Sequence, residues 1–126
     1  SVTKLQSSAQ EFSGALDKIK EELIGAALDI AKEVIKVELS ENSSKVATVL
    51  AQELIKELQS ASKITLRVNP KDHGALSQAT GTLSHVEVVS DAAISIGGVI
   101  AISSAGNIDA QITKRFERVK RAALSE

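Results

Sequence analysis

Apolar residues recur along the first part of the chain at alternating spacings of three and four positions. They are Leu5, Ala9, Phe12, Leu16, Ile19, Leu23, Ala26 and Ile30. This heptad spacing has a period of about 3.5 residues, which is typical of a helix that pairs with another helix. No proline interrupts residues 2–39, so we expect one long helix that reaches roughly 55 Å at about 1.5 Å per residue.

A second apolar row begins next to Leu23 and widens the apolar face of this helix. It comprises Ile24, Leu28, Ala31, Ile35 and Leu39. A narrow stripe suits a partner helix, whereas a broad arc suits burial against a domain. We therefore expect residues 1–22 to project and pair, and residues 23–39 to dock onto the globular part. The alternative is that the whole helix packs within one compact domain.

A polar break follows at residues 40–44, where Ser43 or Ser44 is a candidate N-cap for a second helix over residues 45–59. The break divides the chain into two expected parts. Residues 1–42 form a long, dimerising, coiled-coil-like helix, and residues 43–126 form a globular domain.

Three segments of the C-terminal half have the pattern of strands. Apolar and polar residues alternate over 64–68, as in a half-buried strand, and residues 86–89 and 99–103 supply two more. A helix over 71–79 joins the first two strands and implies a parallel pair. The short loop between the second and third strands implies that these are antiparallel neighbours, and the apolar start of the third favours a central position.

The predicted fold class is therefore α+β. A long N-terminal helix precedes a small domain with a mixed sheet of about three strands in the order βαββα. The second helix and the last helix, which begins at Asp109, are expected to form the layer that covers the sheet.

Glycine, proline and aspartate mark the turns of this half of the chain. The residues are Pro70, Asp72, Asp91, Gly97, Gly98, Gly106 and Asp109. Each has a backbone role: Asp72 caps or enters the first turn of a helix, Asp91 is a turn acceptor, and Gly106 can adopt a positive φ. Asp109 places a carboxylate at the start of the last helix, where the macrodipole favours it.

Composition removes several classes of function. The chain has no cysteine, which excludes thiol chemistry, and its aromatic residues are two Phe, which argues against a base-stacking surface. His73 follows Asp72 directly, and neighbours on a helix do not face each other; His85 has no evident partner. The glycines lack the spacing of a phosphate loop. We expect no catalytic residue, no metal and no cofactor.

Basic residues gather on the last helix, including Arg115, Arg118 and Arg121. They offset the helix macrodipole near its C-terminus, or they form a patch for an acidic partner or a membrane surface. With a net charge of −1 for the whole chain, nucleic acid is not an expected partner.

No apolar run reaches the roughly 20 residues needed to span a bilayer, and no signal peptide opens the chain. The first residue is Ser rather than Met, which is compatible with a fragment of a longer protein.

Four strings, taken in order, resemble the C-terminal domain of the flagellar assembly protein FliH: Val68-Asn69-Pro70-Lys71-Asp72, Val89-Ser90-Asp91, Gly97-Gly98 and Gly106-Asn107-Ile108-Asp109. The outline is also similar to type III secretion stator proteins of the YscL/HrpE kind, and more distantly to the E subunit of V-type ATPase stalks. The resemblance covers roughly residues 45–124, and the preceding long helix fits it.

The resemblance implies a non-enzymatic stator and negative regulator. Such proteins form homodimers that bind the N-terminal region of an export ATPase of the FliI kind, restrain its hydrolysis and connect it to the cytoplasmic ring. It implies a cytoplasmic protein, peripheral to the inner-membrane export apparatus. Arg115, Arg118 and Arg121 are then a candidate partner patch, and the residues from Leu5 to Leu23 the dimer seam.

Two departures from the family pattern stand out. Gly14 and Gly25 are isolated, whereas flagellar members often repeat GxxxG, and the chain lacks the tryptophan of the segment that contacts the ring. Ring contact would therefore need a region not present here. A V-type stalk subunit, a virulence secretion stator and a small ligand-binding or hydrolytic α/β domain are the alternatives, and the last would require a pocket with convergent polar groups.

Overall fold

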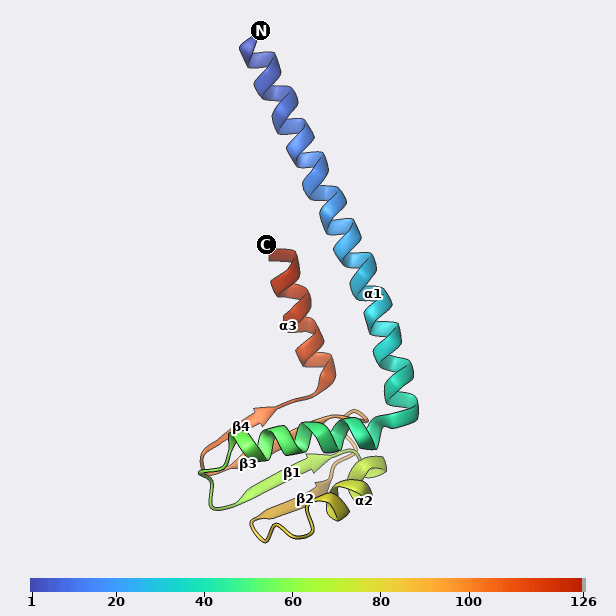
Figure 1. The fold of residues 1–126 in the computed structure, drawn as a ribbon, viewed down its shortest axis with the longest axis vertical. Helices are drawn as coiled ribbons and strands as arrows, with labels where there is room; N and C mark the ends of the chain where they lie inside the picture. The colour runs from blue at the N-terminus through green and yellow to red at the C-terminus, as the bar shows by residue number, and fades with distance from the viewer. Residues whose placement is uncertain (126) are drawn as a thin grey trace.

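A computed structural model describes residues 1–125 of the chain (Figure 1). Its elements are α1 (Val2–Glu57), β1 (Ile64–Val68), α2 (Pro70–Ala79), β2 (Val86–Ser90), β3 (Val99–Ser103), β4 (Gly106–Asp109) and α3 (Ile112–Ser125). A long N-terminal helix thus precedes a small mixed sheet with helices, which confirms the predicted α+β class.

Helix α1 is bent at Asn42, whose φ of −129° and ψ of 29° are not helical. The bend falls within the predicted polar break. We call residues 2–41 the arm and residues 43–57 the base segment. Figure 1 shows the arm rising away from the sheet, while the base segment lies across the sheet.

The sheet has the strand order β2-β1-β3-β4. Strands β1 and β2 are parallel, as predicted from the helix between them. The prediction that the second and third strands are neighbours is wrong, because β3 pairs antiparallel with β1 instead. This arrangement puts β1 and β3, the two strands with fully buried residues, in the middle of the sheet and leaves β2, which carries the exposed Glu87, at one edge.

Strand β4 was not predicted, and it makes the sheet four-stranded rather than three-stranded. It pairs antiparallel with β3 after a tight turn, where Gly106 has a φ of +137°. Ser103 closes the turn by donating its hydroxyl to the carbonyl of Gly106 at 2.7 Å. Asp109 therefore ends a strand and does not open the last helix, which begins at Ile112.

The hydrophobic core lies between one face of the sheet and two helical segments. Leu50 and Leu54 come from the base segment and Leu76 from α2, and they pack on the inward side chains of β1 and β3. The prediction that the last helix belongs to this layer is wrong: α2 takes that place. Among its described residues, α3 has no buried side chain, and it rises beside the half of the arm nearest the bend (Figure 1).

The opposite face of the sheet is not sealed. The strand register places Arg67 of β1 beside Ile100 of β3 on this face, and Ile102 follows two residues later. Arg67 and Ile102 are exposed and Ile100 is half-buried. The apolar run of β3 is therefore buried on one side of the sheet only, although its position inside the sheet agrees with the prediction.

Candidate interaction surfaces

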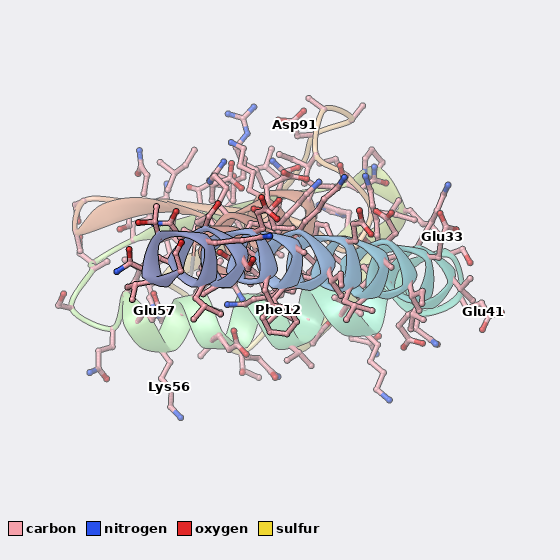
Figure 2. All side chains as sticks on the ribbon, turned by 90° about the horizontal axis from the view of Figure 1, so that it is seen from above. Phe12, Glu33, Glu41, Lys56, Glu57 and Asp91 are labelled. Atoms are coloured by element: carbon pink, nitrogen blue, oxygen red, sulfur yellow. The ribbon has the colours of Figure 1, made fainter. Side chains whose placement is uncertain are left out.

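An apolar strip runs along the arm and is open to solvent. Its predicted members Leu5, Ala9, Phe12, Leu16, Ile19 and Leu23 are all exposed. The five large side chains among them keep between 50% and 71% of their surface accessible. Figure 2 shows Phe12 projecting from α1 on the side away from Asp91. A continuous apolar strip of this kind is uncommon on a protein surface and marks a candidate interaction site.

The strip continues past Leu23 toward the bend. Ile30, Val34 and Val37 keep the spacing of threes and fours, and they are 67%, 64% and 58% exposed. The half of the arm that was expected to dock onto the domain thus also carries a free apolar face. We call the whole set, from Leu5 to Val37, the arm strip.

The second predicted row does face the protein. Ile24, Leu28, Ala31, Ile35 and Leu39 are half-buried. Ile35 and Leu39 line a cleft of about 310 Å³ with Ile112 and Phe116 of α3. Consecutive residues on a helix are about 100° apart, so this row and the arm strip lie on different sides of the arm. Helix α3 therefore covers one apolar side of the arm and leaves the other free.

The side chain of Asp72 is fully buried and accepts three hydrogen bonds. Its Oδ1 accepts hydrogen bonds from the hydroxyls of Ser43, at 2.6 Å, and Ser44, at 2.9 Å. Its Oδ2 accepts from the backbone N–H of Gly97 at 2.7 Å. These bonds compensate the burial of the carboxylate.

Asp72 lies in the first turn of α2, which is one of the two positions predicted for it. The N-cap of α2 is Asn69, whose side chain accepts a hydrogen bond from the N–H of Lys71 at 2.9 Å. The carboxylate of Asp72 instead binds partners outside this helix. The hydroxyls of Ser43 and Ser44 donate to Asp72. Pro70 occupies the start of α2, where its missing N–H costs nothing.

The loop between β2 and β3 holds three of the predicted motif residues. Asp91 accepts from the N–H of Ala93 at 2.9 Å and forms a 2.8 Å ion pair with Arg67. Gly97 has a φ of +77°, and Gly98 donates its N–H to Ser95 at 2.9 Å. These residues shape the backbone.

Asp109 joins the end of β4 to the start of α3. It accepts from the N–H of Gln111 at 3.0 Å and pairs with Lys114 at 2.5 Å. Burial alone would raise the pKa of Asp109, but the hydrogen bonds from Lys114 and Gln111 and the charge of Lys114 outweigh it and lower the pKa.

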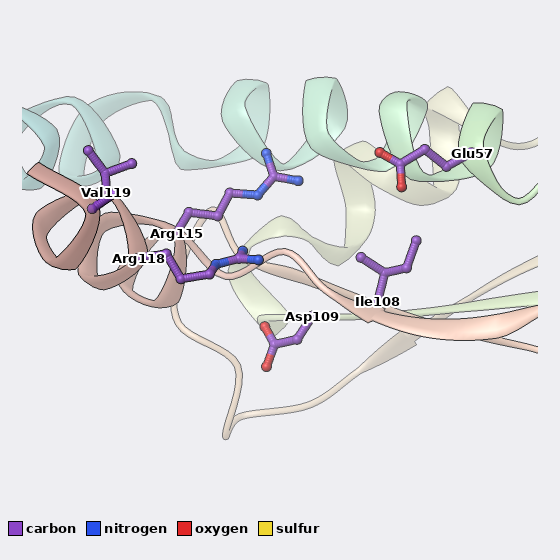
Figure 3. A pocket seen from close by; sticks show the side chains of 7 residues that line it. Glu57, Ile108, Asp109, Arg115, Arg118 and Val119 are labelled. Atoms are coloured by element: carbon purple, nitrogen blue, oxygen red, sulfur yellow. The ribbon is translucent and has the colours of Figure 1, made fainter. Parts of the chain in front are cut away.

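Two of the three predicted patch residues of α3, Arg115 and Arg118, line an open hollow of about 570 Å³. Its lining residues are Glu57, Ile108, Asp109, Arg115, Arg118, Val119 and Ala122. Arg115 and Arg118 extend from α3 toward Ile108 and Glu57 (Figure 3). Arg115 lies 3.6 Å from Glu53, and Arg121 lines the adjoining surface. Within residues 1–125, Arg118 and Arg121 form no ion pair, so their charge is available to a partner.

The two histidines differ, because His73 bonds through its side chain and His85 through its backbone. His73 Nε2 lies 3.1 Å from the carbonyl of Val88, and the carbonyl of His85 accepts from Ile64. In the described part of the chain, no three histidine or acidic side chains come together as metal ligands. None of the helices over residues 1–125 has the length and apolarity needed to cross a membrane.

Sequence reasoning missed the contact between the bend and α2. Ser43 and Asp72 are 29 positions apart, and no local pattern links them. The available signal was the pair of serines at the predicted polar break. A buried serine that does not cap a helix needs another hydrogen-bond partner.

Comparison with known proteins agrees with the motifs of the C-terminal half. A family model described as flagellar assembly protein FliH matches residues 1–119. The chain is also 23% identical over 117 residues to the flagellar assembly protein FliH of Borreliella burgdorferi, a match that covers 87% of this chain. The matched chain spans 38% of that relative's length. Because the family model covers nearly all of the sequence, the chain belongs to the FliH family of flagellar assembly proteins.

Proposed function

We propose that this chain acts as a non-enzymatic stator and negative regulator of the flagellar export ATPase. The observation that carries the proposal is the arm strip, an apolar surface left open beside a folded domain in a member of the FliH family. A chain of this kind would bind one partner through the arm strip and another through the domain. The family match makes the flagellar ATPase, rather than a virulence or rotary ATPase, the partner to test first.

The arm is proposed to form a homodimer through its strip. A heptad strip of large apolar side chains fits the same strip on a second copy, as in a coiled coil. Because the strip reaches Val37, the partner helix would run along the arm almost to the bend. Helix α3 leaves room for it, since α3 packs on the other row of the arm.

The domain from residue 43 onward is proposed to bind the N-terminal region of the ATPase. The arginines of α3 are the candidate contact, because Arg118 and Arg121 are exposed and lie next to the apolar side chains of Ile108 and Val119. Two exposed arginines beside solvent-accessible apolar side chains suit an acidic surface that also offers an apolar side chain. No cofactor is required for this role, and the protein would act at the cytoplasmic side of the inner-membrane export apparatus.

Co-purification with the cognate export ATPase tests the proposal. The wild-type chain is expected to bind the ATPase and to lower its rate of ATP hydrolysis. The variant Arg118→Glu/Arg121→Glu is expected to bind more weakly, whereas the matched control Lys45→Glu/Lys56→Glu, which reverses two exposed charges on the base segment, binds as wild type. Absence of both binding and any change in hydrolysis for the wild-type chain refutes the proposal.

A further inference from the structure

The bend between arm and base segment is a single-residue break in an otherwise continuous helix. Asn42 is the one residue inside α1 with non-helical φ and ψ. Ser40, Ser43 and Ser44 lie close to it, and asparagine and serine have low helix propensity because their side chains compete for the backbone. The backbone at this point therefore has little preference of its own between a bent and a straight helix.

The contacts that favour the bent form converge on Asp72. Its carboxylate binds the hydroxyls of Ser43 and Ser44, the two residues directly after the break. The other oxygen binds the N–H of Gly97, so the start of the base segment, α2 and the loop before β3 meet at one buried charge. Hydrogen bonds to a buried carboxylate are among the stronger ones in proteins.

Gly97 brings the arm itself into this contact. A Cβ added at Gly97 would lie 2.4 Å from Cδ2 of Leu39, the last apolar residue of the arm, and 3.6 Å from the carbonyl oxygen of Ser43. The residue that binds Asp72 thus fits closely between the two sides of the bend. Lys71, next to Asp72, adds a weaker link by donating to the carbonyl of Ser40 at 3.4 Å.

We propose that Asp72 is a latch that holds the arm in its bent position, and that Asn42 is the hinge about which the arm moves when the latch is released. Without the carboxylate, the hydroxyls of Ser43 and Ser44 and the N–H of Gly97 lose their shared partner, and the low helix propensity around Asn42 leaves the angle poorly defined. The half-buried row from Ile24 to Leu39 still contacts α3, which limits how far the arm can swing. Loss of the hydrogen bonds at Asp72 therefore widens the range of arm angles without unfolding the domain. This holds whichever partner the arm strip binds.

Distance measurement between two spin labels tests the latch. The chain contains no cysteine, so labels can be placed through Lys18→Cys on the arm and Ser104→Cys in the turn before β4, both exposed. Residue 18 lies about 36 Å from Asn42 at about 1.5 Å per residue, so a 10° swing moves the label by about 6 Å. A large excess of unlabelled chain suppresses distances between two labelled copies.

The wild-type chain is expected to show one narrow distance distribution. Asp72→Asn is expected to show a broadened or displaced one, with an unchanged helical circular dichroism signal. Asp91→Asn is the matched control, because Asp91 also binds a backbone N–H of the same loop but does not touch the bend. Its distribution should equal that of the wild type.

Two further variants keep the test decisive if Asp72→Asn does not fold. Ser43→Ala/Ser44→Ala removes the two hydroxyl donors, and Gly97→Ala pushes a methyl group against Leu39. Both are expected to broaden or shift the distribution. Wild-type distributions in the folded variants would overturn the proposal.

Discussion

Replacing Leu16 and Ile19 by aspartate tests the arm strip as a dimer contact. The two side chains are 50% and 51% exposed in the single chain. Full burial of such a side chain is worth about 1.5–3 kcal/mol, so covering the exposed half adds about 1 kcal/mol per residue. Two residues on each of two copies give about 4 kcal/mol, which corresponds to a dimer roughly a thousandfold tighter. The aspartates remove this gain and add like charges across the interface.

Sedimentation equilibrium over a wide concentration range measures the effect. The dissociation constant of Leu16→Asp/Ile19→Asp is expected to rise by about a thousandfold or more, so that the chain sediments as a monomer at concentrations where the wild type is dimeric. Ser7→Asp/Gln10→Asp is the matched control, because both residues are exposed and lie on the opposite side of the helix at about 100° per residue. A wild-type monomer, or a variant that dimerises as tightly as the wild type, refutes the reasoning.

Three further changes test the domain. Leu54→Ala removes a fully buried side chain of the core and should lower the free energy of unfolding by about 2–5 kcal/mol in a urea titration, whereas the same change at the exposed Val49 should cost far less. Gly74→Ala should raise it by about 0.5–1 kcal/mol, because the glycine lies inside α2 with nothing within 4 Å of an added Cβ; a decrease would show that the open space is not there. Asp109→Asn should be less stable than the wild type at pH 7, because a lowered pKa means that the folded state favours the ionised carboxylate. That difference should shrink below about pH 4, as the pH falls through the ordinary pKa of aspartate and then the lowered one, and an equal difference at pH 7 and pH 3 would contradict the lowered pKa.

Periodicity along the chain was enough to predict the long helix, the polar break, the strands β1 to β3 and the α+β class. Each of these follows from local patterns, such as the alternation in β1 or the asparagine-proline start of α2. The order of strands did not follow in the same way. A short loop predicts neighbouring strands, but the residues between β2 and β3 span the width of β1 and place β3 on its far side.

The missed strand has a different cause. Gly106 to Asp109 are turn and cap residues by composition, and only pairing with β3 makes them a strand. The role of Asp72 was also out of reach, because its partners lie on a preceding helix and a following loop. The apolar strip of the arm was easier to foresee, since an apolar heptad row needs no tertiary information to be recognised, and its role in pairing stays a prediction.

The arm and the hydrophobic core share one helix, and this has a mechanical consequence. Tension applied to the N-terminal end of the arm is carried along α1 by backbone hydrogen bonds as far as Asn42. Beyond that residue, the load passes to the packing of Leu50 and Leu54 on the sheet and to the hydrogen bonds of Asp72. A pull on the arm therefore loads the bend first and the core second. The stiffness of the bend sets how much of the force is transmitted to the sheet.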